Sequence, residues 1–85
     1  MFFAYVIQNP KGVLYKGHTT DLEARIRYHN LGNIFSRYTK NRGPWKLVYH
    51  EEFQTAAEAI IRERFFKSGQ GREFLKKLLK RDPSA

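Results

Sequence analysis

The sequence predicts an α/β protein of the α+β type: a small, mainly antiparallel three-stranded sheet flanked by helices, in the order β-β-α-β-α-α. Three observations lead to this fold class. Two segments rich in aromatic and β-branched residues flank a turn signal near the amino terminus. Two Thr-x-x-Glu segments mark helix starts, and an apolar stripe with helical spacing follows them. The chain of 85 residues has room for one domain, which we place at residues 1–80, with a short tail at 81–85.

The first two strands are predicted at Phe2–Gln8 and at residues 13–18, because both segments are rich in strand-forming side chains. The sequence Asn9-Pro10-Lys11-Gly12 between them is typical of a three-residue hairpin loop. Asn and Pro favour the first two positions of a type I turn, and Gly favours the left-handed position that follows. The start of the chain is therefore expected to be an antiparallel hairpin.

This hairpin loop sets the register of the two strands. It places Tyr5 opposite Gly17 and Ile7 opposite Tyr15. Because side chains alternate along a strand, both tyrosines share one face, and Gly17 is expected to leave an open place beside them. Two phenols beside a gap suit a phosphate-hydrolysis site, although the pair taken alone is better explained as ordinary strand aromatics.

The later elements are predicted from helix starts and apolar patterns. Thr20 with Glu23 and Thr55 with Glu58 each form a capping box, in which the N-cap and N3 side chains satisfy free backbone N–H groups. The expected elements are a helix from Thr20 to about Asn30, a basic loop at 31–44, a strand at 45–53, a helix from Thr55 to about Lys67, a break at 68–71 and a helix from Arg72 to about Arg81.

Composition narrows the function classes. The chain has 16 Lys and Arg against 8 Asp and Glu, a net charge of +8, which favours a polyanionic partner such as nucleic acid. It has no cysteine, which excludes disulfides, thiolate zinc sites and thiol catalysis. The apolar start at residues 1–7 lacks a basic leader and is too short to span a bilayer. We therefore expect a cytoplasmic protein.

Polar residues at core-facing helix positions are the candidates for chemistry. Glu63 falls on the same helical arc as Ala56 and Ala59, where a carboxylate is costly unless it faces a cation or hydrogen-bond donors. Arg25 and His29 fall in the arc of the preceding helix that also faces the core. One interpretation is a metal ligand beside a phosphate-binding arginine. The alternative is a buried structural pair of Arg25 and Glu63.

In this order, the residues resemble the GIY-YIG nuclease superfamily, in particular its single-domain bacterial branch, and are similar to the amino-terminal nuclease domain of UvrC. Phe3-Ala4-Tyr5 matches the first tyrosine motif, and Tyr15-Lys16-Gly17 matches the second. The resemblance continues with the segments Leu22-Glu23-Ala24-Arg25, His29, Pro44 to Tyr49, and Glu58 to Glu63 with Lys67, so that it spans residues 2 to 80. Phe3, Ala4 and Lys16 replace the glycine and the isoleucines of the two motifs.

The resemblance implies an endonuclease that hydrolyses DNA phosphodiesters with Mg²⁺ or Mn²⁺ and selects DNA by its structure, in repair or recombination. It implies that Glu63 holds the metal ion and that Arg25 steadies the scissile phosphate. Tyr5 would act as the general base, with Tyr15 holding the network and His29 as a substitute or proton relay. The unperturbed pKa of a phenol is near 10, so the base role needs a nearby cation.

Binding would be through the phosphate backbone, because nothing that resembles a base-reading module accompanies the core. A protein partner is a second possible source of specificity, and the oligomeric state stays open. The competing hypothesis is a catalytically inactive nucleic-acid-binding module on the same fold. The candidate phosphate contacts are Lys16, Arg37, Lys40, Arg42, Lys46 and Lys67.

Overall fold

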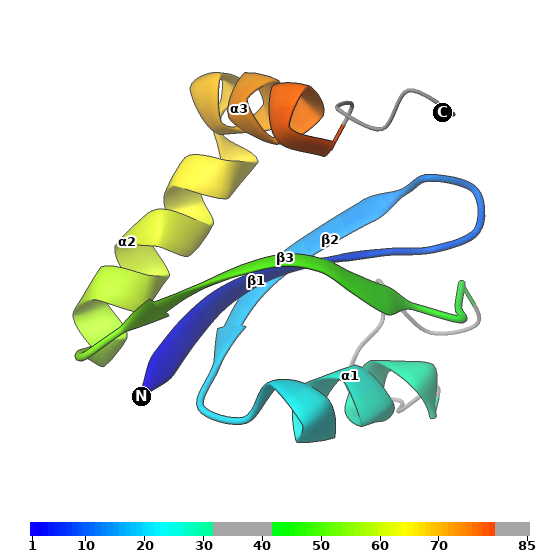
Figure 1. The fold of residues 1–85 in the computed structure, drawn as a ribbon, viewed down its shortest axis with the longest axis horizontal. Helices are drawn as coiled ribbons and strands as arrows, with labels where there is room; N and C mark the ends of the chain where they lie inside the picture. Colours follow the sequence, from blue (N-terminus) through cyan, green and yellow to red (C-terminus); the bar gives the residue numbers. More distant parts are fainter. Residues whose placement is uncertain (32–41, 80–85) are drawn as a thin grey trace.

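The computed structural model describes residues 1–31 and 42–79, and it has the predicted architecture. Within these residues, three strands form one antiparallel sheet in the order β2-β1-β3, and three helices follow the predicted order β-β-α-β-α-α (Figure 1). The α+β fold class is therefore confirmed. The elements are β1 (Phe2–Gln8), β2 (Leu14–Thr19), α1 (Leu22–Asn30), β3 (Lys46–Phe53), α2 (Ala56–Lys67) and α3 (Gly69–Leu79).

The central strand β1 is buried on both of its faces, which explains its continuous apolar sequence. On one face, Ala4 and Val6 pack with Phe66 of α2 and Leu75 of α3. On the other face, Tyr5 and Ile7 pack with Trp45 and with apolar residues of α1. The sheet thus separates α1 from α2 and α3, as Figure 1 shows. Each functional side chain on β1 or β2 is assigned to one of these two sides by strand alternation.

The hairpin has the register that its loop predicts. Tyr5 pairs with Gly17 and Ile7 pairs with Tyr15. Gly12 has a φ of 85°, the left-handed conformation that favours glycine, and its N–H donates to the carbonyl of Asn9 at 3.0 Å. The side-chain oxygen of Asn9 accepts from the N–H groups of Lys11 and Val13, and these hydrogen bonds stabilise the turn.

The boundaries of several elements differ from the predictions. The N-cap of α1 is Asp21, not Thr20: the Asp21 carboxylate accepts from the Ala24 N–H at 3.1 Å. An aspartate and a threonine in sequence both suit an N-cap, and the aspartate takes the position. The strand β2 is shifted by one residue, and β3 begins at Lys46 rather than at position 45. The capping box of Thr55 and Glu58 and the end of α2 at Lys67 are confirmed.

The largest boundary error concerns α3. Its predicted start is Arg72, but the helix begins at Gly69, so residues 69–71 do not break the chain. Ser68 organises the start: its hydroxyl accepts from the Gly71 N–H at 3.0 Å, and its carbonyl accepts from the Arg72 N–H at 2.9 Å. The predicted loop at 31–44 and the predicted end of the last helix lie largely outside the described residues. Across residues 1–31 and 42–79, no helix is long and apolar enough to cross a membrane.

Candidate active site

Three aromatic side chains meet on the face of the sheet covered by α1. The hydroxyl of Tyr5 and Nε2 of His29 lie 2.9 Å apart and form a buried hydrogen bond. The ring of Tyr15 lies with its centroid 4.8 Å from that of His29 and 6.4 Å from that of Tyr5. Tyr5 comes from β1, Tyr15 from β2 and His29 from the last turn of α1. The sequence prediction that these residues lie together is borne out in the geometry.

Gly17 does not leave an open place, contrary to the prediction. The side chain of Tyr5 crosses to β2 and fills that space: a Cβ at Gly17 would lie 2.5 Å from the Tyr5 hydroxyl and 2.7 Å from Cζ. Glycine is therefore required here by a close approach of a side chain. The absence of a side chain at position 17 is what lets the phenol reach His29.

Replacing Gly17 by alanine is expected to push the Tyr5 ring away from His29. Overpacking of this kind lowers the free energy of unfolding by about 1 to 3 kcal/mol. Chemical denaturation would measure the loss, and the tyrosine and histidine resonances would report the broken hydrogen bond. A Gly17→Ala variant with unchanged stability and an intact Tyr5–His29 contact would show that the close approach is absent in solution.

Burial sets the protonation of this pair. It raises the pKa of Tyr5 well above the ordinary phenol value, the nearby phenol of Tyr15 adds to the rise, and Arg25 opposes it. Burial, and then the positive charge of Arg25, lowers the pKa of His29 to about 4. At neutral pH the phenol therefore keeps its proton and the imidazole is neutral. Tyr5 cannot take a proton unless its own proton leaves for another group.

The lowered pKa of His29 predicts a loss of stability in mild acid. The unfolded chain binds a proton on histidine near pH 6.5, whereas the folded chain binds it only near pH 4. The stabilisation is therefore complete above pH 6.5 and is lost as the pH falls towards 4. Between pH 7 and pH 5 the loss is about 2 kcal/mol. Urea unfolding at the two pH values measures it, and His29→Gln should flatten the dependence. An equal slope in that variant would contradict the assignment.

Glu63 lies on the opposite side of the sheet, between two cationic or hydrogen-bonding partners. Its Oε1 is 2.5 Å from Nδ1 of His18, and its Oε2 accepts from Nζ of Lys67 at 2.5 Å. The Glu63 side chain is 15% exposed. Burial by itself would raise the pKa of this carboxyl, but the hydrogen bonds from Lys67 and His18 outweigh it and hold the pKa below its ordinary value. The carboxylate is ionised at neutral pH.

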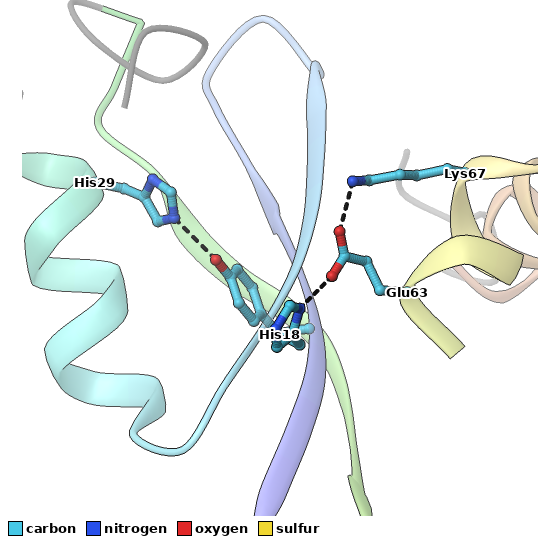
Figure 2. A network of polar contacts seen from close by, with 5 residues as sticks. His18, His29, Glu63 and Lys67 are labelled. Carbon is cyan, nitrogen blue, oxygen red and sulfur yellow. Dashed lines mark hydrogen bonds and ion pairs between the residues drawn. The ribbon is translucent and has the colours of Figure 1, made fainter. Parts of the chain in front are cut away.

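The two groups of side chains meet at consecutive residues of β2. Tyr5 covers Gly17 from the α1 side, and Glu63 contacts His18 from the α2 side. Figure 2 shows His29 on the side of α1 and Glu63 with Lys67 on the side of α2. The charge of Glu63 contributes to the raised pKa of Tyr5, so the two sides interact electrostatically. The Tyr5–His29 pair and Glu63 therefore lie on opposite faces of the sheet, on either side of the edge strand β2.

Arg25 lies on the α1 side, half-buried, with its guanidinium 5.1 Å from the centre of the Tyr28 ring. Its charge acts on Tyr5 and His29, which places it beside the tyrosine cluster. In the part of the chain that the structure describes, Glu63 pairs with His18 and Lys67 rather than with Arg25. The predicted alternative of an Arg25–Glu63 pair is therefore wrong.

His18 was not among the site residues predicted from the sequence. The sequence did contain a signal for it, because the register pairs Ala4 with His18 and so directs the histidine to the face covered by α2.

Among the candidate phosphate contacts, Lys16 lies on the face of the sheet that α2 covers, and Lys67 contacts Glu63. Arg42 and Lys46 are exposed before and at the start of β3. Arg37 and Lys40 lie outside the described residues.

A divalent cation fits these residues on the chemistry of the donors. Glu63 is an ionised oxygen donor close to the site, and Mg²⁺ takes one or two carboxylates and completes its shell with water and phosphate. In the described residues no group of three or more His, Asp or Glu side chains could hold a metal ion, so a cation at Glu63 would take most of its ligands from water and phosphate. A cation at Glu63 would compete with Lys67 and His18 for the negative charge of the carboxylate.

Comparison with known proteins identifies the family of the chain. The family model described as the GIY-YIG catalytic domain matches residues 1–77, and the chain belongs to this family of nuclease domains. The UPF0213 protein of Staphylococcus haemolyticus is 39% identical over 79 residues, covering 93% of this chain and 95% of its own length. The UPF0213 protein of Clostridium perfringens is 43% identical over 67 residues, covering 79% of this chain and 71% of its own length.

A solved structure is similar over nearly the whole chain. The solution NMR structure of a UPF0213 protein from Bacillus halodurans is 34% identical, covers 99% of this chain and 90% of that chain, and has a TM-score of 0.55. The relatives are single-domain proteins of comparable length, and their names state no activity. The class of the protein is thus that of a GIY-YIG nuclease domain with DNA as its substrate.

Proposed function

We propose that this protein is a divalent-metal-dependent DNA endonuclease that recognises DNA by structure rather than by sequence and acts in repair or recombination in the cytoplasm. The observation that carries the proposal is the ionised Glu63 held at the edge strand β2, directly across from the buried Tyr5–His29 pair. The tyrosines and the glutamate also follow one another along the chain in the order of the family motifs.

Arg25 and the lysines would bind the substrate. The guanidinium of Arg25 presents a planar set of N–H donors that suits two oxygens of the scissile phosphate. Lys67 would exchange its contact with Glu63 for a phosphate oxygen as DNA binds, because phosphate supplies the negative charge that Glu63 now supplies. Glu63 would hold Mg²⁺ or Mn²⁺, which neutralises charge that develops on the leaving oxygen.

The Tyr5–His29 pair would move the proton of the attacking water. The Tyr5 hydroxyl accepts the water proton while its own proton passes to Nε2 of His29, 2.9 Å away. This relay requires the tautomer in which Nε2 carries no proton. With its pKa lowered to about 4, His29 is neutral and able to accept, although only as a weak base. A bound phosphate near the pair raises that pKa and makes the transfer easier.

A second candidate function is a nucleic-acid-binding module without catalysis. It is favoured by one observation: both oxygens of Glu63 already have partners, so the carboxylate is accounted for without a cation. This hypothesis gives no role to the buried Tyr5–His29 pair. The two candidates differ in whether phosphodiester bonds break.

A cleavage survey with the wild-type chain separates them. Labelled single-stranded, duplex, flapped and branched DNA would be incubated with Mg²⁺, Mn²⁺ or EDTA, and the products resolved on denaturing gels. The proposal predicts cleavage of at least one structured substrate that EDTA abolishes. Binding to DNA without any product in either metal would favour the inactive module.

A further inference from the structure

A basic pocket between β2 and α3 is separate from the contacts of Glu63. Lys16, Arg72 and Lys76 line it, together with Gln8 and the apolar residue Leu79. No carboxylate lines this pocket. Three cations from two elements therefore converge on one concave surface. Surface lysines that are merely solvated would be expected to point apart.

Strand alternation and helix periodicity explain the convergence. Lys16 and His18 are two residues apart and lie on the same face of β2, so Lys16 neighbours the residue that contacts Glu63. Arg72 and Lys76 are four residues apart on α3, which places them on one side of the helix. The pocket is thus adjacent to the candidate active site on the α2 and α3 side of the sheet.

The positive charges in this pocket are not compensated. Burial lowers the pKa of Lys16, and the charges of Arg72 and Lys67 lower it further. Neither Lys16 nor Lys76 has an ion pair within the described part of the chain. Arg72 donates through Nη1 to the Lys67 carbonyl at 3.0 Å, and its other nitrogens have no described partner. An anion in the pocket would relieve the repulsion and use these donors.

We propose that the pocket formed by Lys16, Arg72 and Lys76 binds a non-scissile phosphate of the nucleic-acid strand that the active site cleaves. The strand would cross the edge of β2 from Arg25 and continue over Lys67 to α3. This proposal rests on the proposed function, which supplies the strand. It extends the path of the substrate from the α1 side of the sheet to the α3 side and gives α3, beyond its apolar packing, a role in substrate binding.

Binding without cleavage tests the pocket. Fluorescence anisotropy would follow a labelled single-stranded DNA oligonucleotide in EDTA over a range of salt concentrations. Lys16→Gln and Lys76→Gln are each expected to weaken binding about five- to tenfold. Each should also reduce the slope of log K against log salt by about 0.7, one phosphate contact on a single strand. Lys77→Gln is the matched control, with the same charge change one residue away, and should bind as the wild type does.

The outcomes separate this proposal from the proposed function. If Lys16→Gln and Lys76→Gln match Lys77→Gln in affinity and in salt slope, the pocket proposal is overturned, whatever the wild type cleaves. If they weaken binding but the wild type cleaves nothing, the pocket stands and the catalytic proposal fails. Competition with inorganic phosphate shows whether the pocket binds a phosphate of the strand or a free phosphate ion. The proposal requires that inorganic phosphate displaces the oligonucleotide poorly. Efficient displacement would indicate a site for free phosphate instead. Thermal unfolding of each variant checks that Lys16→Gln still folds.

Discussion

Glu63→Gln is expected to lower the rate of DNA cleavage by about 10³-fold or more while the protein remains folded. The amide keeps the size and shape of the side chain but loses the negative charge that would hold a divalent cation. Stabilisation of the developing charge by a bound cation is worth several kcal/mol, and each 1.36 kcal/mol is a factor of ten in rate. Single-turnover cleavage of the best substrate from the survey measures the effect.

Glu52→Gln is the matched control for this prediction. Glu52 is an exposed glutamate on β3, opposite Phe3, and its substitution makes the same charge change away from the site. Binding of DNA by Glu63→Gln should persist, because loss of the carboxylate frees Lys67. If Glu63→Gln cleaves DNA as fast as Glu52→Gln does, the Glu63 carboxylate has no role in catalysis. Loss of the fold in Glu63→Gln would instead give the contacts with His18 and Lys67 a structural role.

Gly71→Ala is expected to destabilise the protein by about 3 kcal/mol or more. A Cβ at position 71 would lie 1.6 Å from the carbonyl oxygen of Phe65 and 2.7 Å from Cα of Phe66. The conflict is with backbone atoms of α2, so no side-chain rotation relieves it. The helix α3 must move away from α2, which opens the core contacts of Leu75. Chemical denaturation followed by circular dichroism measures the loss.

Gly69→Ala provides a control two residues away. No atom lies within 4 Å of a Cβ at position 69, and alanine has the higher helix propensity. The free energy of unfolding should stay unchanged or rise by up to about 1 kcal/mol. Equal effects of the two substitutions would show that α3 does not pack on α2 as closely as described.

Local sequence rules predicted much of the fold. The turn Asn9-Pro10-Lys11-Gly12 determines the hairpin register, because loop length and the left-handed glycine leave one alignment of the strands. The capping box at Thr55 determines the start of α2 in the same way. These features depend on residues that are close in the chain, and all of them are confirmed.

The errors arise where tertiary contacts decide between local possibilities. Gly71 looks like a helix breaker in sequence, yet it is inside α3 because only glycine lets the helix approach the carbonyl of Phe65. Gly17 looks like a gap, yet the Tyr5 ring fills it. Periodicity alone could show neither contact, since each joins residues from different elements.

The sequence predicted which residues form the candidate site but not how they are arranged. The tyrosine cluster with His29 follows from the hairpin register and the helical arc. The partners of Glu63 do not, because they depend on how α2 lies over the edge of β2. His18 was therefore missed, and the alternative interpretation paired Glu63 with Arg25 rather than with Lys67. The proposed roles of these residues stay predictions until cleavage is measured.

The central claim is that Glu63 holds a divalent cation at a site for DNA hydrolysis, and Mn²⁺ binding tests it most directly. Electron paramagnetic resonance would follow the loss of the free Mn²⁺ signal as wild-type protein or Glu63→Gln is added, with and without a non-cleavable phosphorothioate DNA. We predict that the wild type binds Mn²⁺ more tightly when the DNA is present and that Glu63→Gln loses this binding. Equal Mn²⁺ binding by the two proteins with DNA bound would contradict the claim.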